Sequence, residues 1–196
     1  LAHATPALDA FLAERSLAKT SAPMTTLRRL NRSLYEAFDY APEATEVDSP
    51  IDVALAKRKG VCQDFAHIMI ATARRWGIPA RYVSGYLFTK REAGDRSASD
   101  ATHAWVEAFV PGSGWVGFDP TNNALAGERH IRVAIGRDYS DVPPSRGIFK
   151  GPANSELAVA VRVTPAQGTR RRDDFLRVVR PMAKNFALED LNAAQV

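Results

Sequence analysis

Apolar residues recur at helical spacing in the first part of the chain. Between residues 8 and 17, and again over residues 24–38, leucine, methionine and phenylalanine return every three or four positions, which is typical of an amphipathic helix. Pro23 precedes the second stretch and suits the first position of a helix, because its missing N–H has no partner there in any case. The pattern predicts two amphipathic helices.

Two more helices follow. Residues 51–59 form a short apolar stretch that Ser49 is placed to cap and Gly60 to end. From residue 63 to 76 the apolar positions again step by three or four, and Gly77 follows at once, as is common after the last turn of a helix. We therefore expect a helix with a buried face over residues 63–76.

The second half of the chain changes to strand patterns. Alternating apolar residues and β-branched or aromatic side chains favour strands, which are separated by turns rich in proline and glycine. We expect strands over residues 81–88, 104–110, 115–118, 131–135 and 157–163. The first three should form an antiparallel meander. Helices first and strands afterwards predict an α+β fold rather than alternating βαβ units.

Composition is that of a soluble globular protein. Of 196 residues 45% are hydrophobic and 24% charged, and no apolar run approaches the roughly 18 residues of a membrane helix. The formal charge of +4 is scattered among nearly as many carboxylates, so it argues against nucleic-acid binding, which usually needs a basic patch and a motif. We expect a domain over residues 1–165 and a charged tail over residues 166–196.

Cys62 is the only cysteine. An intramolecular disulfide and a zinc site of several cysteines are therefore excluded. Its place just before the predicted helix puts the thiol at a helix N-terminus, where unpaired N–H groups and the helix dipole stabilise a thiolate. The dipole contributes only about 0.3–1 kcal/mol at an exposed site, so a nucleophile here also needs a cationic partner. The alternative is a small buried side chain without chemistry.

His103 is the histidine best placed to be that partner. His3 lies near the terminus, His130 near a loop, and His67 about 140° round the helix from Cys62. His103 opens a predicted strand, and Asp119 closes the next one. If these strands pair as a hairpin, the carboxylate reaches the imidazole and accepts its Nδ1–H. Taken alone, His103 is equally explained as a polar residue at a strand edge, and Asp119 as a turn aspartate that bonds its own backbone before proline.

Four motifs resemble the bacterial transglutaminase-like superfamily, whose fold is related to papain. They are GVCQDFA at residues 60–66, GIPARYVSGY at 77–86, HAWVE at 103–107 and GWVGFDPT at 114–121. The resemblance spans about residues 20–165. It implies a papain-like fold and a Cys-His-Asp triad that falls on Cys62, His103 and Asp119. Many similar members carry a β-rich region ahead of the helices, so we expect this chain to be an excised domain.

The implied chemistry is attack of a thiolate on an amide carbonyl to give a thioester. Water would then complete a cysteine peptidase or amidase reaction, and an amine would complete transglutamination. Gln63 and Tyr86 are predicted as oxyanion donors beside the backbone N–H of Cys62. Trp105 and Trp115 are predicted to line a substrate groove, to shield the triad from water, or to be sheet core.

Other predictions concern partners and alternatives. We expect a peptide or protein amide substrate, no cofactor, no metal, no nucleic acid, no membrane and a cytoplasmic location, while the oligomeric state is left open. Acyl transfer to an arylamine is an alternative within enzymes, and a non-catalytic peptide-binding module is an alternative outside them. Asp64, in the first turn, is expected to support its helix.

Overall fold

The computed structural model describes residues 1–89, 95–96, 102–143 and 161–164. These residues belong to one compact unit, Leu1–Thr164. Most of the strand predicted over residues 157–163 lies outside the described residues, and residues 161–164 form no strand. The tail predicted over residues 166–196 also lies outside them, so the predicted division of the chain stays a prediction.

Four helices form in the first half of the chain, as the periodicity predicts. Proline opens the first two, and Thr5 caps the first because its hydroxyl accepts the Leu8 N–H at 3.2 Å. No helix among the described residues is both long and apolar enough to cross a membrane. The helices are α1 Pro6–Glu14, α2 Pro23–Ala37, α3 Ile51–Lys57 and α4 Cys62–Arg75.

The ends of α3 differ from the prediction. Ser49 does not cap it; its hydroxyl accepts the Glu46 N–H at 2.9 Å instead, and Pro50 occupies the cap position without a side-chain bond. The helix stops before Gly60 because Arg58 adopts a left-handed conformation, with φ 54°. The chain then enters the two-residue strand β2, Lys59–Gly60, which pairs in parallel with β1, Asp39–Tyr40.

A five-stranded sheet forms in the second half, with strand order β6-β5-β4-β3-β7. The predicted meander is confirmed, since β3, β4 and β5 pair in antiparallel sequence. The strand predicted over residues 131–135 pairs with the outer side of β3. The strands are β3 Ala80–Leu87, β4 His103–Val110, β5 Gly114–Asp119, β6 Ala124–Leu125 and β7 His130–Gly136, and a short 3-10 helix, η2 Tyr139–Asp141, follows.

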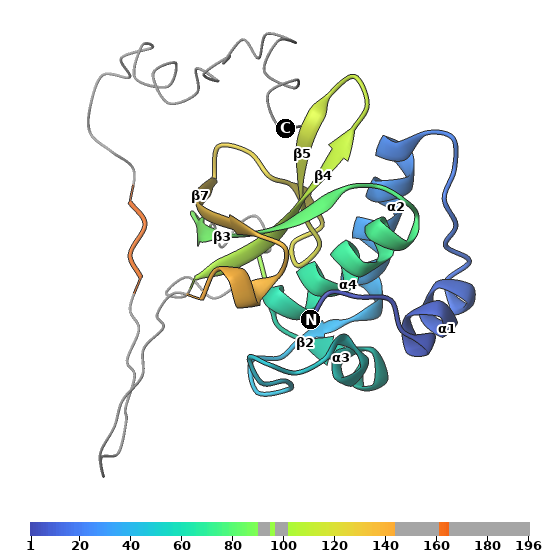
Figure 1. Cartoon of the computed structure of the whole chain (residues 1–196). Helices are drawn as coiled ribbons and strands as arrows, with labels where there is room; N and C mark the ends of the chain where they lie inside the picture. The colour runs from blue at the N-terminus through green and yellow to red at the C-terminus, as the bar shows by residue number, and fades with distance from the viewer. Residues whose placement is uncertain (90–94, 97–101, 144–160, 165–196) are drawn as a thin grey trace, which may run out of the picture. The chain divides into compact units, whose positions relative to one another are not determined.

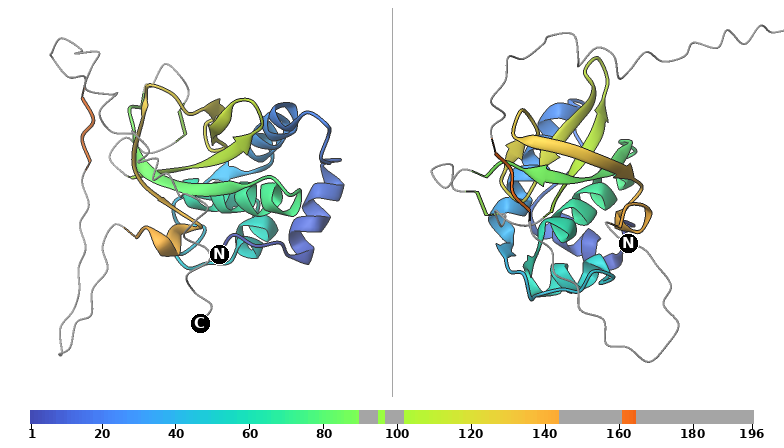
Figure 2. Two further views of the ribbon diagram at one scale, coloured as in Figure 1. Left: turned by 45° about the horizontal axis from the view of Figure 1, so that its top comes forward. Right: turned by 90° about the vertical axis from the view of Figure 1, so that its left-hand side faces the viewer.

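The core lies between α4 and this sheet. Ten consecutive residues of α4, Asp64 to Ala73, are buried, and α4 packs against the even-numbered positions of β4. The helices gather on one side of the sheet (Figures 1 and 2). The N-terminus of α4 thereby comes to the region where β4 begins, and an α+β fold of the predicted class is confirmed.

Gly85 lets β3 pass close to its neighbours at the start of β4. It pairs with His103, and a Cβ added there would lie 2.0 Å from the Ile131 carbonyl oxygen and 2.9 Å from the Trp105 ring. No side chain fits in that space without a backbone shift.

We predict that Gly85→Ala destabilises the protein by about 1–3 kcal/mol, because overpacking a tight site forces backbone displacement. Urea unfolding measures the change. Gly127→Ala is the matched control, since a Cβ at Gly127 meets no atom within 4 Å. Equal stability of the two variants would contradict the close approach.

Candidate active site

Cys62 is the first residue of α4 and is half-buried. The turn before it is held by Asp64, whose carboxylate accepts the Val61 N–H at 2.8 Å and the Thr45 hydroxyl at 2.6 Å. Gly60 leaves room for that carboxylate, because a Cβ there would lie 2.7 Å from it. Burial raises the pKa of Asp64, and these hydrogen bonds oppose the rise. Asp64 therefore supports the helix start, as expected for a first-turn acid.

His103 and Asp119 meet across the β4–β5 hairpin. The register pairs Val106 with Phe118 and Glu107 with Gly117, so Asp119 lies beside the beginning of β4. His103 Nε2 lies 2.8 Å from Asp119 Oδ2, and the two side chains are 2% and 0% exposed. The prediction that Nδ1 contacts the aspartate is wrong, because Nε2 is the ring nitrogen that faces Asp119 Oδ2.

Asp119 accepts five hydrogen bonds. Its Oδ1 takes the backbone N–H groups of Thr121 at 3.1 Å and Asn122 at 3.2 Å. Its Oδ2 takes the Asn122 side-chain amide at 2.8 Å, together with two imidazole nitrogens. Burial raises the pKa of the Asp119 carboxyl, but the charge of His103 and these hydrogen bonds hold it well below its ordinary value. The group is therefore a carboxylate at neutral pH.

Cys62 completes the contact with His103. A side-chain hydrogen bond joins the thiol to the His103 ring, and since Nε2 faces Asp119, Nδ1 is the nitrogen that faces sulfur. Burial lowers the pKa of His103, but the Asp119 carboxylate and the bond with Cys62 outweigh burial and raise it well above its usual value. This electrostatic environment favours an imidazolium beside the sulfur.

His130 also binds Asp119, which sequence reasoning missed. Its Nε2 lies 3.1 Å from Asp119 Oδ2 and its side chain is 4% exposed. Its Nδ1 accepts the Gly127 N–H at 3.2 Å, so the ring hydrogen must be on Nε2, where it is donated to the aspartate. The sequence analysis did not predict that β7 pairs with β3. This pairing brings His130 next to the hairpin, and no local sequence pattern indicates it.

His103, Asp119 and His130 also have the spacing of a metal site, since one ligand atom from each lies within 4.8 Å of the others. A neutral imidazole ligates a metal through a nitrogen that carries no hydrogen. On His130 the Gly127 N–H occupies the Nδ1 lone pair, which puts the hydrogen on Nε2. The donor set therefore fits a hydrogen-bonded carboxylate better than a metal centre, and absence of a metal stays a prediction.

The two predicted tryptophans have different surroundings. Trp105 is 2% exposed; its ring stacks on His103 at a centroid distance of 6.1 Å and meets His130 edge-on at 5.2 Å. Its ring therefore packs against both histidines, while its role as a shield from water stays a prediction. Trp115 is 43% exposed at the opposite end of β5 from Asp119, with the Arg81 guanidinium 4.0 Å over its ring. The structure does not bring Trp115 to the triad.

The predicted oxyanion donors are also placed. Gln63 follows Cys62, but its side-chain amide donates to the Val47 carbonyl at 2.6 Å, so this N–H already has an acceptor. Tyr86 lies on β3 and lines a separate cavity of about 410 Å³ together with Ile131 and residues 161–164. Neither side chain forms a hydrogen bond with Cys62 among the described residues. Their role as oxyanion donors stays a prediction.

A cysteine at a helix N-terminus, facing a histidine and an aspartate on adjacent strands, is the arrangement of papain-related cysteine enzymes. A model of the Transglutaminase-like superfamily matches residues 10–120, which include all three residues. The chain belongs to this superfamily, and the expected family is confirmed.

The chain is also similar in sequence to individual proteins. The chain is 42% identical over 169 residues to the uncharacterized protein Rv2569c of Mycobacterium tuberculosis, covering 83% of this chain and 52% of that protein. It is 33% identical over 165 residues to a protein-glutamine gamma-glutamyltransferase of Pseudomonas aeruginosa, covering 76% of this chain and 24% of the relative. The chain spans about half the length of the mycobacterial relatives.

A solved structure has the same fold. A Cytophaga hutchinsonii protein assigned as a cysteine protease matches with a TM-score of 0.57 and 27% identity, covering 69% of this chain and 43% of that one. The proteins that this chain resembles thus include one named as a glutamine gamma-glutamyltransferase and one assigned as a cysteine protease.

We predict that Asp64→Ala lowers stability by about 1–2 kcal/mol, because the Val61 N–H and the Thr45 hydroxyl lose their acceptor at the helix start. Thermal unfolding measures the loss. Asp48→Ala serves as control, since Asp48 is exposed and forms no side-chain hydrogen bond or ion pair among the described residues. A change of the same size in both variants would argue against this role of Asp64.

Proposed function

We propose that this protein is a thiol-dependent acyl-transfer enzyme that cleaves amide bonds of polypeptides through Cys62, His103 and Asp119. The observation that carries the proposal is the chain of contacts from the Cys62 thiol through the His103 ring to the buried Asp119 carboxylate. Each residue of the chain has a part in known triad chemistry: a nucleophile, a base and a group that orients the base.

In the proposed reaction, His103 Nδ1 takes the thiol proton and the Cys62 thiolate attacks the amide carbonyl carbon. A C–S bond forms, and the C–N bond breaks as His103 returns the proton to the departing amine. The product is a thioester on Cys62. Water, deprotonated by His103, then attacks the thioester, and the C–S bond breaks as Cys62 takes up the proton. An amine that enters in place of water gives a transamidated product.

Asp119 acts through His103. Its carboxylate accepts the Nε2–H, which fixes the ring orientation, and its charge stabilises the imidazolium. The backbone N–H of Cys62, at the start of α4, is the proposed oxyanion donor, and Gln63 or Tyr86 supplies a second one only after its side chain moves. We infer that His130 is a positioning residue, because its Nε2–H donates to the oxygen that His103 uses.

Two alternatives make different predictions. A non-catalytic peptide-binding module would leave Cys62 as an ordinary thiol, whereas the proposed enzyme has a reactive one. An arylamine acyltransferase would form its thioester only with small acyl donors, whereas the proposed enzyme acts on polypeptide glutamine or peptide bonds. A cytoplasmic location and independence of metal stay predictions. Loss of activity in EDTA with recovery on adding calcium would refute metal independence.

We predict that iodoacetamide alkylates Cys62 readily at about pH 6.5, where a free cysteine thiol is almost wholly protonated. Asp119→Asn should slow this alkylation by about tenfold or more. Asp119 raises the pKa of His103, so removing its charge lowers that pKa and removes the imidazolium at a lower pH. Because Cys62 is the only cysteine, mass spectrometry reads one site. Equal rates in the wild type, Asp119→Asn and the unfolded chain would contradict a paired thiol.

Turnover tests the enzyme class separately. Cys62→Ala should abolish release of ammonia or amine from a library of glutamine-containing peptides, and His103→Ala should lower it by at least about 100-fold, the usual contribution of a general base. If the protein instead transfers an acyl group from a small thioester to an arylamine and does not act on peptides, the arylamine alternative is favoured.

We predict that His130→Leu lowers kcat with little change in KM, and that His130→Gln restores most of the loss because its amide keeps an N–H donor. The lost charge-assisted bond predicts a decrease of about 10-fold to 100-fold. The N–H that His130 donates also makes Asp119 a weaker acceptor for the His103 proton, so its loss should raise the pKa of His103. In the pH profile of the Cys62 alkylation rate, the change that accompanies loss of the His103 proton should therefore move to higher pH in the leucine variant alone. A purely structural role would lower stability in both variants and leave that change in place.

A further inference from the structure

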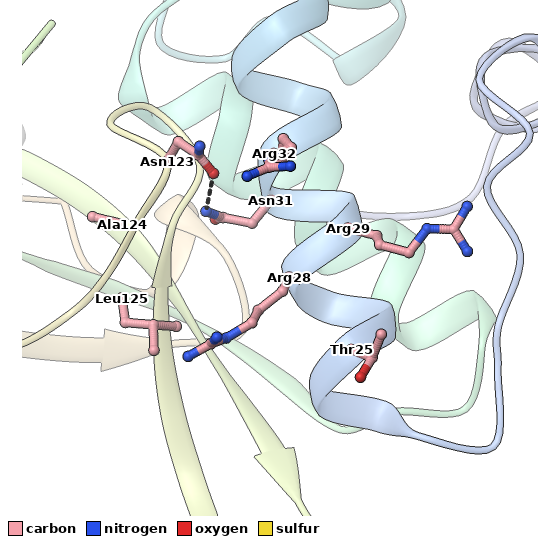
Figure 3. Close-up of a pocket in the computed structure, with 8 residues that line it drawn as sticks. All are labelled: Thr25, Arg28, Arg29, Asn31, Arg32, Asn123, Ala124 and Leu125. Carbon is pink, nitrogen blue, oxygen red and sulfur yellow. Dashed lines mark hydrogen bonds between the residues drawn. The ribbon is translucent and has the colours of Figure 1, made fainter.

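A second cavity, of about 510 Å³, lies between α2 and β6, and it contains none of Cys62, His103 and Asp119. Figure 3 shows Arg28 and Arg32 extending from α2 on either side of Asn31 towards β6 and its leading turn, while Arg29 points to the other side of the helix. The lining residues are Thr25, Arg28, Arg29, Asn31, Arg32, Asn123, Ala124 and Leu125. No carboxylate is among them.

The arginines of this cavity have no acidic partners among the described residues. Other arginines generally do, since seven of them form ion pairs with aspartate or glutamate: Arg15, Arg58, Arg75, Arg81, Arg129, Arg132 and Arg137. In α2 the first acidic residue is Glu36, in the last turn. Like charges one turn apart on a helix, such as those of Arg28 and Arg32, repel each other. Glu36, one turn beyond Arg32, pairs with Arg15, so no carboxylate in the cavity lining balances the charges of Arg28 and Arg32.

Asn31 supplies a second, independent observation. Its side chain is buried, at 4% exposure, and its Oδ1 has no hydrogen-bond donor among the described residues. Its amide nitrogen donates to Asn123 Oδ1 at 3.3 Å (Figure 3). Buried polar atoms without a partner are few in native proteins and call for one. A ligand with anionic groups would pair with the arginines, and a ligand with N–H donors would supply the partner that Asn31 Oδ1 lacks among the described residues.

The cavity also adjoins the proposed reaction centre through the chain. Asn123 directly follows Asn122, whose backbone and side chain both donate to Asp119. One wall of the cavity is therefore the continuation of the turn that holds the catalytic carboxylate.

We propose that this cavity binds an acidic segment of a polypeptide substrate, with Arg28 and Arg32 pairing with its carboxylates. Guanidinium groups suit carboxylates because both are planar and form paired hydrogen bonds. A peptide, unlike inorganic phosphate, carries backbone N–H donors as well as carboxylates. The proposal rests on the proposed function only in taking a polypeptide as the substrate, and it adds the class of sequence that the enzyme selects.

Binding to the Cys62→Ala protein tests the proposal without turnover. The probe is a fluorescent peptide with one glutamine flanked by three glutamates, compared with the same peptide carrying glutamine at those three positions. Anisotropy should show that the acidic peptide binds more tightly, and that the preference shrinks as salt rises. Arg28→Gln with Arg32→Gln should weaken binding of the acidic peptide by about tenfold, the sum expected of two exposed ion pairs, and leave the neutral peptide unchanged.

Lys19→Gln with Lys59→Gln is the matched control. Both lysines are exposed and form no ion pair among the described residues, and replacing them removes the same charge as replacing the two arginines. Equal weakening in the arginine and lysine variants would show a general charge effect and overturn the proposal, as would equal affinity for the two peptides. Failure of the proposed function would appear elsewhere, as a Cys62 thiol that does not react at low pH, and it would leave this binding result intact.

Discussion

The buried contact between His103 and Asp119 is the interaction on which the account of this site depends. A carboxylate removed from water is costly unless charge and hydrogen bonds replace its hydration. Here two backbone N–H groups, an asparagine amide and two imidazoles do so. Because Asp119 stays ionised, the ring of His103 can hold a proton in a place where burial alone would remove it.

The fold supplies the geometry that this contact needs. The β4–β5 hairpin sets His103 beside Asp119 by its register, and the packing of α4 on β4 brings the helix N-terminus to the same place. Backbone pairing and the core therefore position three side chains that are far apart in the sequence. Membership of the Transglutaminase-like superfamily is consistent with such a scaffold. In the proposed mechanism, hydrolysis and amine transfer differ only in what attacks the thioester.

Much of this arrangement could be predicted from the sequence because it follows from local patterns. The period of the apolar residues predicted α4, and the turn at residues 111–114 predicted the hairpin that joins His103 to Asp119. The ring nitrogen that binds Asp119 could not be predicted, since it depends on side-chain orientation. His130 was missed because its position depends on β7 pairing across β3, a long-range contact that no local periodicity encodes. Trp115 was predicted to lie near the triad or in the sheet core because it is close to Asp119 in sequence, but it lies towards the other end of β5 and is 43% exposed.

The protonation of His103 is the property that tests this account most directly. Titrating its ring by NMR, with His103→Gln to assign the signal, measures the effect of Asp119 without any substrate. The account predicts an imidazolium that persists at about pH 8, well above the ordinary histidine pKa of about 6.5. A ring that loses its proton near the ordinary value, with no response to Asp119→Asn, would contradict it.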